Sequence, residues 1–102
     1  MKEVRQKKLV GPVLRGMDEE IIGALLVAIE QDNPDHELFY EDLGGYVRIH
    51  APQCCRVTRK SLEAALGRPL RLSELEPSLS AFAGRMRYQG DDVLEWYLER
   101  ED

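Results

Sequence analysis

Residues 18–51 read DEEIIGALLVAIEQDNPDHELFYEDLGGYVRIHA, and this stretch decides the fold. It opens on Asp18, a helix N-cap residue, and then repeats apolar side chains at helical spacing. Asn33 precedes a proline, which disfavours the α conformation, so we expect a helix over about residues 19–31 that ends abruptly. The helix is apolar nearly all round. We therefore expect it to be the core helix, covered on both sides, with Gly23 allowing close approach.

The second half of this stretch predicts a β-hairpin closed by Gly44-Gly45, because glycine takes the positive φ of a two-residue primed turn. That register pairs Glu41 with Arg48 and divides the strand residues between two faces. We expect the first face to be core: Leu38, Tyr40, Val47, Ile49 and Ala51. The second face mixes aromatic and charged side chains, which is typical of interfaces as well as of solvated faces. Its residues are Phe39, Glu41, Leu43, Tyr46, Arg48 and His50.

Shorter elements flank this helix and hairpin. Residues 9–15 predict a short strand, and Pro12, which has no N–H group, favours a position at a sheet edge. Further along, Thr58 can cap a helix over about residues 59–66 that Gly67 ends. Its inward residues are expected to be Leu62, Ala65 and Leu66.

The last third predicts one more short helix and a second hairpin. Ser73-Glu74-Leu75-Glu76 matches a capping box, while Pro77 predicts a short or irregular helix that ends near residues 79–80. The apolar segment Ala81-Phe82-Ala83 is expected in the core. Strands over residues 84–89 and 93–99 fit a three-residue loop best, because this register matches opposing side chains. The pairs expected inside are Tyr88 with Leu94 and Met86 with Trp96, and the pair expected outside is Arg87 with Glu95.

Composition bounds the class of protein. A chain of 102 residues is enough for one domain with one core, and no apolar run approaches the roughly 20 residues that span a bilayer. The net charge of -5 opposes nucleic-acid binding. We predict an α+β fold, a single compact sandwich with two antiparallel hairpins, one long core helix and two short helices. Residues 1–8, basic and poor in apolar side chains, are expected to form a mobile arm on a domain of residues 9–102. The polar start lacks a signal-peptide core, which favours the cytoplasm.

The sequence contains no motif that identifies a catalyst. It lacks a Gly-rich phosphate loop, a nucleophile elbow and a His-x-x-x-His metal spacing. Cys54 and Cys55 are adjacent, the wrong spacing for a zinc knuckle or a redox pair, so we expect two free thiols in or beside a strand. His50 could approach Cys54 along one strand. A small thiol enzyme therefore remains an alternative, but we predict no catalytic, metal-binding or cofactor-binding residue.

Several spaced motifs, taken together, resemble a known family. They are Val10-Gly11-Pro12-Val13, Asp32-Asn33-Pro34, Tyr46-Val47-Arg48-Ile49, Thr58-Arg59-Lys60-Ser61-Leu62-Glu63, Leu66-Gly67-Arg68-Pro69 and Ser80-Ala81-Phe82-Ala83-Gly84-Arg85. In order and spacing they resemble the effector, or coupling, proteins of bacterial multicomponent diiron monooxygenases. This is the MmoB/DmpM family, and the toluene and alkene four-component branch is the most similar. The resemblance covers roughly residues 9–98, and Pro77 departs from the helix expected in that branch.

The resemblance implies a regulatory protein without a cofactor, and not an enzyme. Such a protein docks on the large, diiron-containing subunit of the hydroxylase and tunes its active-site conformation. NADH-derived electrons and O2 then stay coupled to the oxidation of an aromatic or alkene hydrocarbon. It is expected to be cytoplasmic and monomeric when free, with no nucleic-acid or membrane partner. The rival interpretation is a generic protein-interaction module unrelated to monooxygenases.

We predict partner contact at three places. These are the helix end at Asn33 and Pro34, the strand face at Tyr46 and Arg48, and the segment of Leu79, Ser80, Phe82 and Gly84. Each place has a purely structural alternative. Asn33 and Pro34 can serve only to end the helix, Arg48 only to pair with Glu41, and Phe82 only to fill the core.

Overall fold

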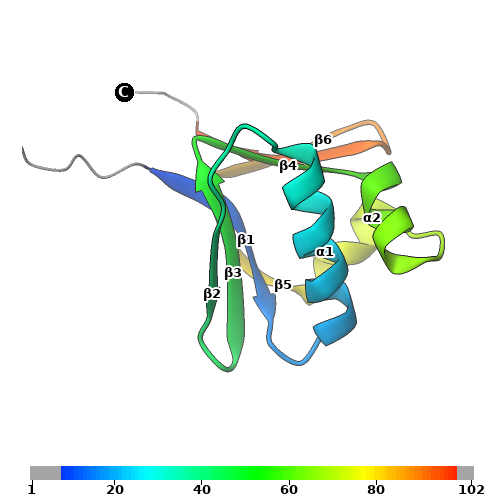
Figure 1. The fold of residues 1–102 in the computed structure, drawn as a ribbon, viewed down its shortest axis with the longest axis horizontal. Coiled ribbons are helices and arrows are strands. Elements are labelled where there is room, and N and C mark those ends of the chain that lie inside the picture. The colour runs from blue at the N-terminus through cyan, green and yellow to red at the C-terminus, as the bar shows by residue number, and fades with distance from the viewer. Residues whose placement is uncertain (1–7, 99–102) are drawn as a thin grey trace, which may run out of the picture.

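The computed structural model describes residues 8–98, and Figure 1 shows two antiparallel sheets with helices packed against them. The first sheet has the order β2-β3-β1-β5, with bounds β1 Leu9–Arg15, β2 Phe39–Asp42, β3 Tyr46–Pro52 and β5 Leu79–Ala83. The second has the order β4-β7-β6, with bounds β4 Cys54–Thr58, β6 Arg85–Gln89 and β7 Val93–Tyr97. The helices are α1 Glu19–Asp32, α2 Arg59–Leu66 and the 3-10 helix η1 Leu72–Ser78. The predicted α+β sandwich is confirmed.

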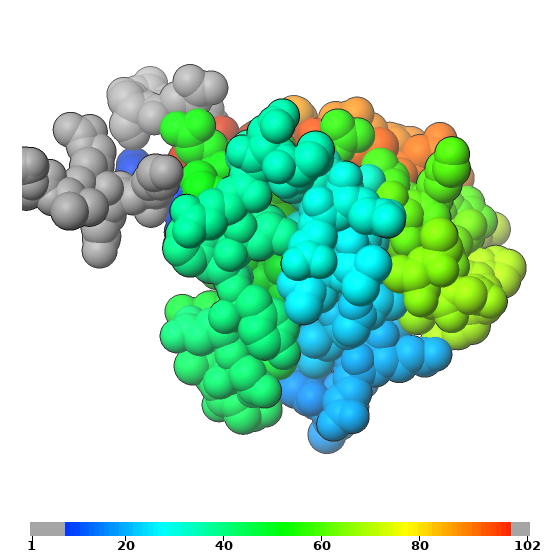
Figure 2. Space-filling view, in the orientation of Figure 1, coloured from blue at the N-terminus to red at the C-terminus, as the bar shows by residue number. Residues whose placement is uncertain are grey.

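Helix α1 forms where the sequence predicts it but is covered on one face only. Asp18 is the N-cap residue, although its carbonyl, and not its side chain, accepts the Ile22 N–H at 2.9 Å. The buried stripe is Ile22, Ala24, Leu25, Ala28 and Ile29. Val27 is 47% exposed, and a Cβ on Gly23 would meet nothing within 4 Å. Figure 2 shows the outer face of α1 at the molecular surface, so the expected cover on both sides and the close approach at Gly23 are wrong.

Strand β1 lies between β3 and β5, so the predicted edge position is wrong. Pro12 is fully buried opposite Phe82 of β5. A central proline is tolerated because the paired residues of β1 and β3 skip Gly11 and Pro12. Gly11 has a φ of 146°, and a Cβ there would lie 2.2 Å from the Ile49 carbonyl oxygen. Only glycine permits this approach of the two strands.

The first hairpin has the predicted two-residue turn. Glu41 pairs with Arg48, Gly44 has a φ of 87°, and the Leu43 N–H donates to the Tyr46 carbonyl at 2.8 Å. The expected core residues Val47, Ile49 and Ala51 are buried, and Leu38 is half-buried. Tyr40, in contrast, is 49% exposed because β2 is an edge strand whose residues are all exposed.

The second hairpin has the predicted three-residue loop and the predicted register. Tyr88 faces Leu94, Met86 faces Trp96 and Arg87 faces Glu95. Trp96 and Leu94 are fully buried, as expected, and Met86 is half-buried. Tyr88, which was also expected inside, is 36% exposed. The predicted extension of this strand to Glu99 lies outside the described residues.

Helix α2 has the predicted bounds and caps. The Thr58 hydroxyl accepts the Ser61 N–H at 3.1 Å, and Gly67 ends the helix with a φ of 78°. Leu62 is buried and Leu66 half-buried, but Ala65 is exposed. The inward stripe follows the i, i+4 row, and Ala65 falls beside it.

Helix η1 is irregular, as Pro77 predicts, but its cap lies elsewhere. The Glu74 carboxylate accepts the Arg71 N–H at 2.9 Å, and the Glu74 N–H donates to the Arg71 carbonyl at 2.9 Å. The predicted Ser73 cap is therefore wrong, because Glu74 reaches back to a residue without a capping side chain. The helix ends at Ser78, just before the predicted end.

Two single residues carry the chain from one sheet to the other. Gln53 separates β3 from β4 with a φ of 67°, and Gly84 separates β5 from β6 with a φ of 90°. Gln53 also donates its N–H to the Lys8 carbonyl at 3.0 Å and accepts the Leu98 N–H at 3.3 Å. The first and last described residues therefore meet at one of these two single-residue crossovers.

The predicted arm, residues 1–8, falls outside the described residues except for Lys8, so its mobility remains a prediction. Within residues 8–98, no helix is long and apolar enough to cross a membrane.

Candidate interaction surface

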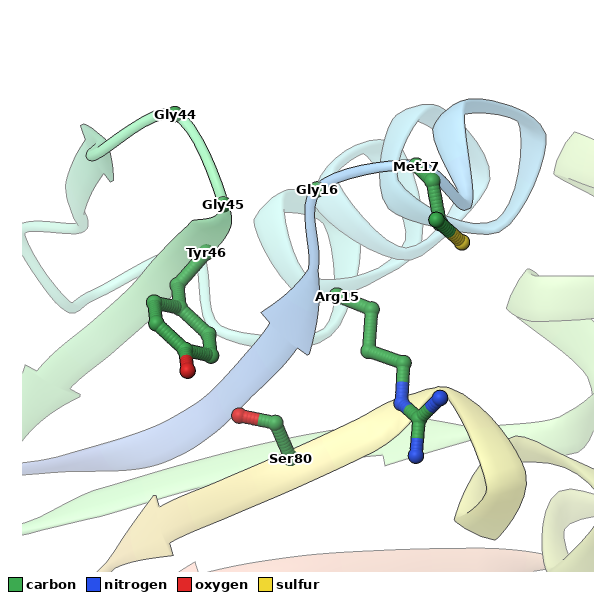
Figure 3. A pocket seen from close by; sticks show the side chains of 7 residues that line it. All are labelled: Arg15, Gly16, Met17, Gly44, Gly45, Tyr46 and Ser80. Atoms are coloured by element: carbon green, nitrogen blue, oxygen red, sulfur yellow. The ribbon is translucent and has the colours of Figure 1, made fainter.

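A shallow cavity of ≈ 670 Å³ lies at the end of the first sheet from which α1 starts. Three segments line it: the end of β1 with the turn into α1, the β2–β3 turn with the start of β3, and β5 (Figure 3). Its residues are Arg15, Gly16, Met17, Gly44, Gly45, Tyr46 and Ser80. We call this cavity the strand-end hollow.

A backbone hydrogen bond joins two of the segments that line the strand-end hollow. The Gly16 N–H donates to the Gly45 carbonyl at 2.8 Å, which ties the end of β1 to the β2–β3 turn. A Cβ on Gly16 would lie 2.2 Å from the Gly44 carbonyl oxygen, so glycine is required at this approach.

The side chains around the hollow combine apolar area with polar groups. Met17 is 81% exposed and Tyr46 is 52% exposed. In Figure 3 the hydroxyl groups of Tyr46 and Ser80 point into the same space, while the Arg15 side chain extends from β1 toward β5. Aromatic residues, Met and Arg are enriched at protein interfaces. Exposed apolar groups beside hydroxyl and guanidinium groups therefore suit a protein partner.

A β-bulge brings Ser80 into the hollow. Val13 pairs with Ala81, but the next residue of β1, Leu14, pairs with Leu79, so Ser80 is the extra residue. A bulge of this kind re-aims a side chain. Leu79, opposite the buried Leu14, packs against the core instead.

Phe82 and Gly84 lie further along the same segment. Phe82 is 43% exposed on β5, so the expectation that Ala81-Phe82-Ala83 fills the core is wrong; the segment is an edge strand. A Cβ on Gly84 would lie 2.6 Å from Val10 Cγ1 and 2.8 Å from the Tyr97 carbonyl oxygen. Gly84 therefore belongs to the junction between the sheets.

Arg48 extends the surface along β3 from Tyr46. Its guanidinium lies 3.4 Å from the Glu41 carboxylate, and the two side chains are 50% and 57% exposed. An exposed pair of this length contributes little to stability. Arg48 can therefore exchange Glu41 for a partner at small cost.

Asn33 and Pro34 lie at the other end of α1, about 20 Å along the helix axis from its start. Asn33 is 4% exposed, and its side-chain amide donates to the carbonyls of Ile29 and Arg56, both at 2.7 Å. Its Oδ1 accepts the Arg56 N–H at 3.1 Å. The side chain is thus occupied inside the molecule, whereas Pro34 is exposed.

The sequence predicts partner contact at Tyr46 and Ser80, which line the hollow. It does not single out Arg15 and Met17, which line the hollow as well. A signal for Met17 was present, because it is an apolar residue between a glycine and a helix N-cap, outside every strand or helix pattern.

The thiol and imidazole groups do not assemble into a reactive site. Burial, and then Cys54, raises the pKa of the Cys55 thiol to about 12. Burial, and then Glu95, also raises the pKa of Cys54. Raised values leave little of the reactive thiolate at neutral pH. His50, whose pKa is lowered first by burial, is on β3 and Cys54 on β4, so the expected approach along one strand is wrong.

Within residues 8–98, no group of three or more His, Cys, Asp or Glu residues is placed to hold a metal ion.

The fold and the strand-end hollow define a class of protein, a small sandwich domain that offers a partner a concave, mixed apolar and polar surface.

Comparison with known proteins identifies the family. Residues 8–97 match the MmoB/DmpM family, and the chain belongs to it. The chain is 43% identical over 93 residues to the effector subunit of an alkene monooxygenase system from Xanthobacter autotrophicus. That match covers 91% of this chain and 89% of the relative. The resemblance inferred from the sequence motifs is confirmed.

Solved structures share the fold. A chain from the structure of a phenol hydroxylase–regulatory protein complex gives a TM-score of 0.71 at 26% identity, over 90% of this chain and 100% of that chain. The soluble methane monooxygenase regulatory protein B gives 0.66 at 21% identity, over 97% of this chain and 71% of that chain. The second similarity, at this identity, concerns the fold alone.

Proposed function

We propose that this protein is the effector, or coupling, protein of a bacterial multicomponent diiron monooxygenase. The observation that carries the proposal is 43% identity, along nearly the full length of both chains, to an effector subunit of an alkene monooxygenase system. The protein binds the large subunit of the hydroxylase and leaves the chemistry to it. It has no cofactor of its own, and the iron belongs to the partner.

The effect on the hydroxylase follows from differential binding. An effector shifts a conformational equilibrium only by as much as its affinities for the two conformations differ. A tenfold bias needs about 1.4 kcal/mol, which a few contacts at the strand-end hollow can supply. The favoured conformation couples NADH-derived electrons and O2 to the oxidation of an aromatic or alkene hydrocarbon.

The proposed contact surface is the strand-end hollow with its neighbours on β3 and β5. Tyr46 and Ser80 line the hollow, while Arg48, Leu79 and Phe82 extend it. Pro34 and Gly84 are proposed as peripheral contacts. Asn33 is proposed to act indirectly, because its side chain holds the backbone of Arg56 in place. Exposed aromatic and Arg side chains support this choice, because they dominate the binding energy of many interfaces.

The working location is the cytoplasm, where NADH is supplied, and the free protein is monomeric. An interaction module unrelated to monooxygenases would have the same fold and a similar surface. It would not alter a diiron hydroxylase.

A titration separates these two possibilities. The protein is added to the diiron hydroxylase of a multicomponent monooxygenase, together with the electron-transfer components and NADH, and product formed per NADH consumed is recorded. We expect saturable stimulation near one effector per active site. A folded sample that neither binds nor changes the rate or coupling of an active hydroxylase would favour the unrelated module.

A further inference from the structure

Each sheet ends in two edge strands: β2 and β5 in the first, β4 and β6 in the second. An edge strand presents unpaired N–H and C=O groups to which another chain can add, and proteins usually block it with charges or cover. Three of these four edges are blocked in this protein.

Side chains close the edge of β4. The Asn33 amide donates to the Arg56 carbonyl at 2.7 Å and accepts the Arg56 N–H at 3.1 Å, as a neighbouring strand would. The Asp32 carboxylate accepts the Thr58 N–H at 2.7 Å and the Ser61 hydroxyl at 2.8 Å. No further strand can add at these groups without displacing α1.

Charged side chains protect the edges of β2 and β6. β2 carries Glu41 and Asp42, and β6 carries Arg85 and Arg87. Each of these two short edge strands therefore holds two charges of one sign. Desolvating such charges opposes the addition of a strand.

The edge of β5 has neither protection. Its sequence, Leu79-Ser80-Ala81-Phe82-Ala83, contains no charge, and Ser80, Ala81 and Phe82 are exposed. Its strand partner is β1 alone, and the Leu79 N–H donates to the Glu76 carbonyl. No other backbone hydrogen bond described within residues 8–98 joins β5 to a segment outside β1. Beyond Leu79, the outer row of N–H and C=O groups is therefore open along an uncharged strand.

We propose that the outer edge of β5 accepts an extended segment of the hydroxylase as an added strand. This proposal rests on the proposed function. The edge adjoins the strand-end hollow through Ser80, so one partner can cover both. The segment should be uncharged over about five residues, the length of the strand it joins, and apolar beside Phe82. A second copy of this chain is disfavoured, because two molecules of net charge -5 repel each other.

Hydrogen exchange tests the backbone pairing directly. We expect the outward-facing amides among residues 80–83, which β1 does not pair, to exchange about tenfold more slowly in the hydroxylase complex than in the free protein. This corresponds to about 1.4 kcal/mol of protection. Amides of β4, already paired to β7 and to α1 side chains, serve as the internal reference.

A charge placed on the edge supplies the matched test. Ala81→Lys introduces a charge at an exposed position of β5, and we expect it to weaken hydroxylase binding at least tenfold in calorimetry. Gln89→Lys makes the same kind of change on the edge of β6 and should leave binding unchanged. Circular dichroism checks that both variants fold.

The outcomes are distinguishable. Protection of β5 together with loss of binding in Ala81→Lys supports the added strand. Hydroxylase binding without protection of β5 overturns it and leaves the effector function standing. Protection that instead grows with the concentration of the free protein, with a dimer in sedimentation, assigns the edge to a second copy and overturns the proposal. Absence of hydroxylase binding by the unmodified protein overturns the proposed function itself.

Discussion

Asn33 takes the place of a missing strand beside β4. Its side-chain amide makes three hydrogen bonds, two of them to the backbone of Arg56, in a position that is 4% exposed. A side chain that satisfies buried backbone groups is costly to remove, because the groups left behind lose both protein and water partners. The residue is therefore central to how α1 is held against the second sheet.

Asn33→Ala should lower the free energy of unfolding by about 2–3 kcal/mol, because it leaves the Arg56 N–H and C=O without partners. Urea denaturation followed by circular dichroism measures this change. Pro34→Ala, at the exposed neighbouring position, is the control and should change stability far less. A loss below about 0.5 kcal/mol in Asn33→Ala would contradict the assigned role.

Arg48→Glu should weaken hydroxylase binding by at least fivefold, or about 1 kcal/mol, while the fold persists. The substitution reverses a charge on the proposed contact surface and places it beside Glu41. Lys60→Glu on α2, an exposed position of the same charge, is the control. Equal affinity of the two variants in calorimetry would remove Arg48 from the interface.

The two adjacent thiols should differ in reactivity. Cys55 is fully buried with a pKa of about 12, so iodoacetamide at pH 8 should modify it only after unfolding. Cys54 is half-buried and should react first, although slowly, because burial raises its pKa as well. Mass spectrometry of Cys54→Ser and Cys55→Ser separates the two sites. Equal rates for both thiols would contradict the burial of Cys55.

The pKa of Cys55 also sets a direction for the pH dependence of stability. The value in the folded protein, about 12, lies above the ordinary value of 9.0. The unfolded chain therefore loses its thiol proton first, and this group's contribution to stability, complete below pH 9, is lost as the pH rises toward 12.

The crossover from β5 to β6 depends on a residue without a side chain. Gly84 has a φ of 90°, and a Cβ would lie within 3 Å of both Val10 and Tyr97. Gly67, at the end of α2, has a similar φ of 78° with open space around it. These two glycines therefore separate backbone strain from steric exclusion.

Gly67→Ala should cost about 1 kcal/mol, the price of a left-handed conformation for alanine. Gly84→Ala should cost at least about 2 kcal/mol more, because the backbone of β7 must also shift. Thermal unfolding of the two variants measures the difference. Similar losses would show that the junction between the sheets has room for a methyl group.

Both hairpins could be predicted from sequence because their turns and side-chain pairs specify one register. Gly44-Gly45 fixes the first, and the opposition of Arg87 to Glu95 fixes the second. The position of β1 could not be predicted, since it depends on β5. Three of the five residues of β5 are small, and the bulge at Ser80 breaks the alternation of its side chains, which leaves no pattern to recognise.

The strand-end hollow was only half predictable for a related reason. Tyr46 and Ser80 stood out from the sequence, but their neighbours come from segments that only the fold brings together. The interior role of Asn33 was also hidden, because its partner Arg56 lies in a strand far along the chain.

Within residues 8–98, one hydrophobic core joins α1 with both sheets. Buried residues from β1, β3, β4 and β7 belong to a single cluster with those of α1 and α2. The two sheets are also linked at Gln53 and Gly84, each by one residue. Neither sheet can therefore unfold without exposing the interior of the other.

Urea unfolding should accordingly be a single cooperative transition. The near-UV circular dichroism of the aromatic residues and the far-UV signal of the backbone should have the same midpoint. An earlier loss of the near-UV signal would indicate that the second sheet, which holds Trp96, opens separately.

Trp96 is the single tryptophan of the chain and has no exposed surface. Substitution with fluorotryptophan would give the protein one ¹⁹F resonance, placed between Cys55 and Met86 at the centre of the second sheet. A partner that only covers the surface would leave the chemical shift of that resonance in place, whereas a partner that repacks the interior would move it. The protein thus contains a natural position for a magnetic probe that separates docking from internal rearrangement, because only this chain would carry the label.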